Sequence, residues 1–252
     1  MKFENMLNTI TLGDSYKLIK DIPDKSIDLI ITDPPYEIIT TGAGILKDRK
    51  TRFLDNIQGK FDRGINEEIL DEFCRVMKRI NIYIWCSKAQ IKKYLDYFLA
   101  KTNLYEILIW HKTNPVPTIN GTYLCDKEYC LFFRDKGVEL KGTVENKRTV
   151  WTTKCNVEDK KKYRHPTIKP LPIIKTLIEN SCNKGDIVLD CFSGSGTTCV
   201  AAKELGRQFI GIEIDPEYYK ISIDRLHGIL ADGQISFDTL AERTKDEIQI
   251  WN

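Results

Sequence analysis

Long apolar runs, closely paired cysteines and internal repeats are all absent from this sequence of 252 residues. No stretch reaches the roughly 20 apolar residues that a transmembrane helix needs. The opening residues MKFENMLNTI lack the apolar core of a signal peptide. We therefore expect a cytoplasmic protein that does not enter a membrane. None of the eight cysteines forms a Cys-x-x-Cys pair, which argues against a zinc ribbon or a disulfide framework, and we expect no metal site.

A strong overall charge is also missing, because the formal net charge is only +2. The charge is nevertheless uneven along the chain. Residues 134–169 hold eleven Lys or Arg against five Asp or Glu, whereas residues 213–252 hold four against nine. A basic segment of this kind is either a solvated face or an anion-binding patch, and it indicates nucleic acid only when other features agree.

Apolar strands alternate with amphipathic helices along most of the chain. This alternation is typical of an α/β fold with a largely parallel sheet, and the length suits a single domain over residues 1–252. Two of the strands, 105–110 and 128–133, look like an antiparallel pair. The predicted strands are 8–12, 27–33, 81–86, 105–110, 128–133, 186–192 and 209–214, and the predicted helices are 67–79, 89–100, 171–182, 197–205 and 216–226. Residues 37–64 are polar and too long for a plain connection, so we expect a mobile functional loop or a small insertion there.

The segment DCFSGSGTT, residues 190–198, joins a predicted strand to a predicted helix through a glycine turn. Glycines allow the backbone to approach a ligand closely, and a following acid at the end of the next strand, here Glu213, is placed to bind both hydroxyls of a ribose. A dinucleotide fingerprint would need a third glycine where this chain has Cys199. The pattern therefore favours a cofactor that contains adenosine but no phosphates, such as S-adenosyl-L-methionine (SAM).

The segment TDPPY, residues 32–36, ends another buried strand with two consecutive prolines. Ligands of open α/β sheets bind outside the carboxyl ends of strands where the strand order reverses. If the two strands are neighbours there, Asp33 faces the glycine turn. The prolines hold the backbone stiffly extended, so that Asp33 and the Pro34 carbonyl offer two hydrogen-bond acceptors beside the Tyr36 ring. Such an arm suits a nucleobase amine, whose two N–H groups need acceptors, and the base must leave its duplex to reach it.

With these motifs the chain resembles the β-class DNA adenine methyltransferases, in which a DPPY motif precedes the SAM-binding motifs. LGDS, DPPY, HPTIKP, DCFSGSGTT and IGIEIDPEYY occur in the order of that family, and the match covers most of the chain. The resemblance implies a Rossmann-like methyltransferase fold of circularly permuted motif order. It implies a catalytic set of Asp33, Pro34, Pro35 and Tyr36, and a cofactor-binding set of Asp14, Thr167, Lys169, Asp190, Phe192, Ser193, Gly194, Ser195, Gly196, Thr197 and Glu213.

Within those sets the resemblance assigns parts of the cofactor. Asp14 would contact its adenine, although Asp14 could equally cap the helix that starts at Ser15. Thr167 and Lys169 would lie near its methionine part together with Ser195 and Thr197. Phe192 and Gly194 would shape the turn.

The resemblance also implies that the target-recognition region is the basic stretch 134–164. It is short, and within it Lys160, Lys161, Lys162 and Arg164 are the candidates for phosphate contact, with a solvated loop as the alternative. Trp151 and Tyr163 either stack on bases or pack.

The expected activity is transfer of a methyl group to the N6 amine of adenine in DNA. Methylation of N4 of cytosine, of RNA or of a protein amide, and an inactive DNA-binding homologue remain alternatives. A homodimer and a role in restriction–modification, in a phage or as an orphan enzyme are left open.

Overall fold

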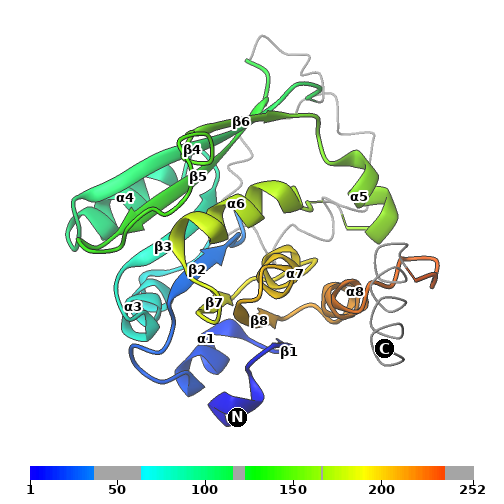
Figure 1. The fold of residues 1–252 in the computed structure, drawn as a ribbon, viewed down its shortest axis with the longest axis horizontal. Helices are drawn as coiled ribbons and strands as arrows, with labels where there is room; N and C mark the ends of the chain where they lie inside the picture. The colour runs from blue at the N-terminus through cyan, green and yellow to red at the C-terminus, as the bar shows by residue number, and fades with distance from the viewer. Residues whose placement is uncertain (37–63, 116–122, 166, 236–252) are drawn as a thin grey trace, which may run out of the picture.

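The computed structural model describes residues 1–36, 64–115, 123–165 and 167–235. Most of the loop expected over 37–64 therefore lies outside the described residues. Within them, no helix combines the length and the apolar character that crossing a bilayer would require. Figure 1 shows the arrangement of the described helices and strands.

The described strands form one eight-stranded sheet, and it has the largely parallel character that the alternation predicts. The strand order is β1-β8-β7-β2-β3-β5-β4-β6, with β1 at one end and β6 at the other (Figure 1). The strands are β1 Thr9–Leu12, β2 Leu29–Thr32, β3 Asn81–Cys86, β4 Leu104–Lys112, β5 Lys127–Arg134, β6 Val150–Thr153, β7 Ile187–Asp190 and β8 Gln208–Glu213.

Helices cover both faces of this sheet. Besides short 3-10 turns at Phe3–Asn5 (η1) and Ile19–Asp21 (η2), the helices are α1 Ser15–Leu18, α3 Glu67–Val76, α4 Ile91–Leu99, α5 Val157–Tyr163, α6 Leu171–Ser181, α7 Thr197–Glu204 and α8 Pro216–Leu226. Residues of α3 and α4 belong to one core cluster, and residues of α6, α7 and α8 pack with the other. The fold is therefore a three-layer α/β sandwich.

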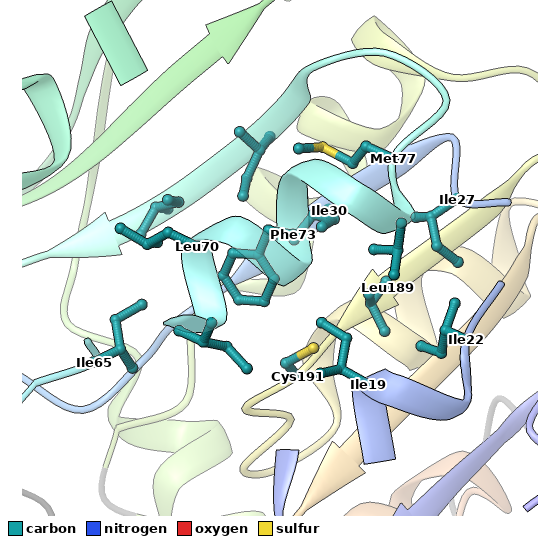
Figure 2. Close-up of a cluster of buried hydrophobic side chains, with 14 of the residues drawn as sticks. Ile19, Ile22, Ile27, Ile30, Ile65, Leu70, Phe73, Met77, Leu189 and Cys191 are labelled. Carbon is teal, nitrogen blue, oxygen red and sulfur yellow. The ribbon is translucent and has the colours of Figure 1, made fainter. Parts of the chain in front are cut away.

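The first core cluster lies between α3 and the sheet. Phe73 of α3 is fully buried in this cluster together with Leu189 of β7, and Figure 2 shows Cys191 below its ring. The apolar residues of α3 recur at Ile69, Leu70, Phe73 and Val76, which is the helical spacing that places them on one buried face. Asn66 caps this helix by accepting a hydrogen bond from the Ile69 N–H.

The sheet reverses its strand order between β2 and β7. These two strands pair in parallel, with Leu29 opposite Val188 and Ile30 opposite Leu189. From β2 the sheet continues through β3, and from β7 it continues through β8 in the opposite direction. The neighbouring strands expected from the sequence are therefore confirmed, and their carboxyl ends open onto the crevice where ligands of α/β sheets bind.

One strand runs against the others. β5 pairs antiparallel with β4, which confirms the expected pair, and it also pairs antiparallel with β3 on its other side. The first residues of β5 consequently lie beside the last residues of β3, with Tyr129 opposite Cys86. A side chain at the start of β5 is thus brought to the same edge of the sheet as the ends of β2 and β7.

The basic stretch 134–164 is more ordered than its weak periodicity predicts. β6 extends the sheet by pairing in parallel with β4, and α5 follows it. The strand is only four residues long, too short for a clear alternation pattern. The helix has no buried residue, but its first turn is acidic (Glu158 and Asp159) and its last turn is basic. Charges in this order stabilise a helix through its dipole and leave no apolar stripe in the sequence.

Candidate active site

The catalytic arm predicted from the sequence continues directly from β2. All four residues of β2 are buried, and the chain then passes through Asp33, Pro34, Pro35 and Tyr36 without further sheet pairing. The Pro35 carbonyl accepts a hydrogen bond of 3.1 Å from the amide of Gln90, a side chain with no exposed surface. The arm is therefore stiffened by its prolines and tethered at Pro35.

The glycine turn lies at the end of the adjacent strand β7. Gly194 and Gly196 have φ values of +50° and +74°, a region that residues with a side chain rarely adopt. A side chain at Gly194 would also approach the Nε2 atom of His165 to 3.3 Å. Ser193 secures the turn, because its N–H donates to the Ile212 carbonyl of β8 at 2.9 Å. The helix α7 begins immediately after Gly196.

Glu213 ends β8 and folds back over this turn. Its Oε2 atom accepts a hydrogen bond of 2.6 Å from the Gly194 N–H, and its Oε1 atom accepts one of 2.9 Å from the Asp215 N–H. Burial raises the pKa of the carboxyl, and the backbone N–H donors oppose that rise. Each carboxylate oxygen can accept a further hydrogen bond, so the acid remains able to bind a diol.

Asp190 joins the end of β7 to the end of β2. Its Oδ1 atom accepts hydrogen bonds from the Thr32 hydroxyl at 3.0 Å and from the Phe192 N–H at 3.1 Å. Burial nevertheless raises the pKa of this carboxyl to about 7, against the effect of donors that include the Thr198 hydroxyl. Asp190 is thus a structural link between the two predicted sites. Ionising its buried carboxyl costs free energy.

Both predicted sites open into one cavity of about 520 Å³. All four residues of the predicted catalytic set line it, and so do ten of the eleven predicted cofactor residues: Asp14, Thr167, Lys169, Asp190, Phe192, Ser193, Gly194, Ser195, Thr197 and Glu213. The eleventh, Gly196, is the N-cap of α7. The structure therefore brings together residues that the sequence places up to 199 positions apart, from Asp14 to Glu213.

The wall of this cavity is acidic. Among the described residues that line it, five carry carboxylates, namely Asp14, Asp33, Glu128, Asp190 and Glu213, and Lys169 is the one lysine. The ring of His165 also lines the cavity, but burial and then the nearby Arg225 lower its pKa to about 3, so the imidazole is neutral at pH 7. Such a wall suits a cation or a hydroxylated ligand better than a pyrophosphate.

Asp14 both caps a helix and lines the cavity, so neither of the two roles considered for it excludes the other. Its Oδ1 atom accepts a hydrogen bond of 3.0 Å from the Tyr16 N–H at the start of α1. Thr167 also lines the cavity, and its N–H donates a hydrogen bond of 3.3 Å to Nδ1 of His165.

Lys169 of the predicted cofactor set lines the cavity and pairs with two carboxylates. Its ammonium forms ion pairs with Asp33 and with Glu128 of β5, the latter at 3.2 Å. Glu128 was not singled out in the sequence. The available signal was a lone acid at the start of an otherwise apolar strand.

Arg225 of α8 is another residue that the motifs did not reveal. The guanidinium is buried and donates to the Thr197 hydroxyl at 2.6 Å and to the Ser195 carbonyl at 3.2 Å. It also lies 4.8 Å from the ring of Tyr163, a half-buried side chain that packs against the guanidinium. Trp151 likewise packs against the core. Arg225 also donates to the Ser195 hydroxyl at 3.2 Å, so it holds the side chains of both Ser195 and Thr197, which line the cavity.

The four basic residues expected to contact DNA lie on or directly after α5. Lys160, Lys161 and Lys162 belong to the helix, so this part is not the loop considered as an alternative, and Arg164 is its C-cap with φ +53°. The side chains of Lys161, Lys162 and Arg164 are exposed, whereas Lys160 is half-buried. Burial and then the charge of Lys112 lower the pKa of Lys160.

Comparison with known proteins gives a consistent family. A family model described as DNA methylase, of the N6_N4_Mtase type, matches residues 27–224. The type II methyltransferase M.HinfI of Haemophilus influenzae is 33% identical over 253 aligned positions, which cover 89% of this chain and 70% of that protein.

Two solved structures extend the comparison to the fold. The crystal structure of the M1.HpyAVI–SAM complex has a TM-score of 0.61 at 27% identity and covers 86% of this chain and 98% of that one. The cytosine-N4-specific PvuII DNA methyltransferase has a TM-score of 0.62 at 18% identity, over 86% of this chain and 85% of that one, which is a likeness of fold alone. From the extent of the family match and the identity to M.HinfI, the chain belongs to the DNA methylase family.

Proposed function

We propose that this protein transfers a methyl group from SAM to the N6 amine of adenine in DNA. The observation that supports it most directly is the single cavity shared by the arm of β2 and the glycine turn of β7. Within it the Oδ1 atom of Asp33 is buried and has no hydrogen-bond partner among the described residues. A buried acceptor left unpaired costs free energy, and at the wall of a cavity it is a place for a ligand donor.

The residues around the glycine turn fit SAM. Glu213 would bind the ribose hydroxyls, because it is held against Gly194 by the backbone and keeps spare acceptor capacity. Asp14 would contact the adenine ring, and Phe192 and Ser193 would form the wall of the turn. The acidic lining would favour the positively charged sulfonium of this cofactor. When bound, SAM supplies an electrophilic methyl group.

The arm of β2 would hold the target amine. Asp33 Oδ1 and the Pro34 carbonyl would each accept one N–H of the amine, which aligns the nitrogen lone pair toward the cofactor side of the cavity. Tyr36 would stack on the base. Because Asp33 already contacts the amine, its carboxylate is also placed to receive the proton that the nitrogen loses once it is methylated. Positioning of this kind, with acceptors fixed before the reaction, is the main contribution a protein can make here.

The choice of adenine rests on the first residue of the arm. In the families that the chain resembles, an aspartate at this position accompanies adenine in most cases and a serine accompanies cytosine. The carboxylate of Asp33 is also the stronger acceptor for an amine hydrogen. Methylation of cytosine N4 is the second candidate, because the family description includes both N6 and N4 enzymes and a cytosine-N4 enzyme shares the fold.

Nucleoside mass spectrometry tests this proposal. Unmethylated DNA is incubated with the purified protein and SAM, digested to nucleosides and compared with the same reaction of an Asp33→Ala variant. We expect N6-methyladenine from the wild type and neither methylated base from the variant. N4-methylcytosine as the main product would overturn the choice of base, and absence of both products would favour an inactive DNA-binding homologue.

DNA would approach from the side of α5, where Lys161, Lys162 and Arg164 are exposed. The segment 134–164, which carries these exposed basic residues, would serve as the target-recognition region. A homodimer, a cytoplasmic location and a role in restriction–modification stay predictions.

A further inference from the structure

A buried lysine connects the catalytic arm to β5. The Nζ atom of Lys169 forms an ion pair with Oδ2 of Asp33 and lies 3.2 Å from Oε2 of Glu128 and 3.4 Å from the Tyr36 hydroxyl. The Lys169 side chain is 8% exposed, and the Asp33 side chain is 26% exposed. The ammonium is therefore placed at the target end of the cavity, beside the residue proposed to hold the amine.

Several groups fix this ammonium in place. Glu128 is itself paired with Lys112 of the neighbouring strand β4, so its carboxylate is held from two sides. The Lys169 ammonium also lies 5.1 Å from the ring of Trp85 and 5.6 Å from the ring of Tyr36, within the range of cation–π attraction. A buried charge retained in a protein needs partners of this quality. The position of Lys169 is thus determined by four surrounding side chains.

The two oxygens of Asp33 are left in different situations. Lys169 occupies Oδ2, while Oδ1 is buried without a hydrogen-bond partner in the part of the chain that the structure describes. We propose that Lys169 is a positioning residue, whose ammonium orients Asp33 through Oδ2, keeps the carboxylate ionised and leaves Oδ1 as the acceptor for the target amine. This inference rests on the proposed function, and it replaces the expectation that Lys169 contacts the methionine part of SAM.

The charges around Asp33 agree with this role. Burial raises the pKa of the Asp33 carboxyl, the Lys169 ammonium opposes that rise, and the Glu128 carboxylate adds to it. Among the described residues, the other titratable groups within electrostatic reach of Asp33 or Lys169 are Tyr36, Cys86, Cys130, Lys160, His165 and Asp190, with Lys112 beyond Glu128. Among them, Lys169 is the cation paired directly with Asp33. Without it the Asp33 pKa rises further, and a protonated carboxyl would present a donor where an acceptor is needed.

The test compares Lys169→Met with two control variants. Lys169→Arg keeps the charge at the same place. Lys175→Met removes a lysine from helix α6, which begins two residues after Lys169; Lys175 pairs with Glu204 at 2.5 Å and does not line the cavity. For each protein, the single-turnover rate of methyl transfer to DNA is measured from pH 6 to pH 9, and SAM affinity is measured by calorimetry.

For Lys169→Met we expect a loss of roughly a hundred- to a thousand-fold in rate at pH 7, the usual effect of removing one preorganised contact. The rate should then rise up to about tenfold per pH unit, because only the ionised fraction of Asp33 is competent. SAM affinity should stay within about threefold of wild type. Lys169→Arg and Lys175→Met should keep the shallow pH dependence of the wild type.

Two results would overturn the positioning role. One is a tenfold or greater loss of SAM affinity in Lys169→Met with an unchanged pH profile, which would place Lys169 on the cofactor. The other is a wild-type rate at pH 7. If Lys169→Met does not fold, the same pH measurement is made on the Lys169→Met/Glu128→Gln double variant. This double variant removes one cation and one anion together. If the wild type transfers no methyl group to DNA, the proposed function fails and this inference fails with it; failure of the inference alone requires an active wild type.

Discussion

The hydroxyl of Thr32 donates a hydrogen bond of 3.0 Å to Oδ1 of Asp190, although 158 residues separate the two in the chain. Thr32 precedes the proposed catalytic arm, and Asp190 precedes the glycine turn. This hydrogen bond therefore joins the two halves of the proposed site where β2 and β7 end side by side.

Asp33→Ala should abolish methyl transfer and leave SAM affinity within a few-fold, because Asp33 is proposed to hold the target amine and not the cofactor. Loss of one preorganised contact costs on the order of a hundred- to a thousand-fold in rate. Asp33→Asn is the matched control, since it keeps the shape and one acceptor. A variant that binds SAM normally and still turns over at nearly the wild-type rate would show that the assignment of Asp33 is wrong.

Glu213→Ala should weaken SAM binding by roughly ten- to a hundred-fold, because a hydrogen bond to a charged group contributes about 1.5–3 kcal/mol. DNA affinity should change little, since Glu213 lies at the glycine turn. Glu213→Gln keeps an acceptor for the Gly194 N–H and should lose less. Calorimetry with SAM and, separately, with DNA makes the comparison, and an unchanged SAM affinity would argue against this cofactor geometry.

Replacing Lys160, Lys161, Lys162 and Arg164 together with Gln should weaken DNA binding and reduce its dependence on salt. Each phosphate contact that is lost lowers the slope of log affinity against log salt by about 0.9, so the four could account for a decrease of up to about 3–4. Because Lys160 is half-buried, its replacement alone should change the slope by a different amount than replacement of one of its exposed neighbours.

The matched control removes the same charges from the opposite edge of the sheet. Lys25, Lys78, Arg79 and Lys184 are exposed and precede β2, β3 and β7. Their replacement should leave the slope nearly unchanged. If both sets reduce it equally, α5 is an ordinary solvated face.

The stability of the wild type should fall relative to Asp190→Asn as the pH rises from 5 to 8. In the folded protein burial raises the Asp190 pKa to about 7, whereas an unfolded aspartate titrates near 3.9. Between those values the folded state binds more protons, so raising the pH favours unfolding by up to about 1.4 kcal/mol per pH unit. Urea denaturation of both proteins at pH 5, 6, 7 and 8 measures the difference, and parallel curves would contradict it.

The adjacency of β2 and β7 could be predicted because it follows from a general rule of α/β sheets applied to two recognisable motifs. Placing the two motifs at adjacent strand ends also predicts which residues line the cavity, and nearly all the predicted site residues do line one cavity. β6 and α5 could not be predicted in this way. Their stabilisation comes from an edge pairing with β4 and from charges along a short helix, and neither leaves an apolar period.

The pairing of Lys169 with Asp33 shows a second limit of sequence analysis. The two residues are 136 positions apart, and the acid that also holds the lysine is Glu128, on the antiparallel strand. A motif specifies which residue types occur together along the chain. It does not specify the direction in which a flexible side chain such as lysine turns, because that depends on charges supplied by other strands.

The order of the strands has a consequence for synthesis of the chain on the ribosome. β2 has β7 as one of its two partners, and β1 pairs with β8, so both early strands wait for the last part of the sheet to emerge. At the usual 5–20 residues per second, the interval between β2 and β7 is roughly ten to thirty seconds. During that time the apolar strand LIIT has an unpaired edge, at which the nascent chain can aggregate unless a chaperone binds it. The site is completed only when the last strands have been translated.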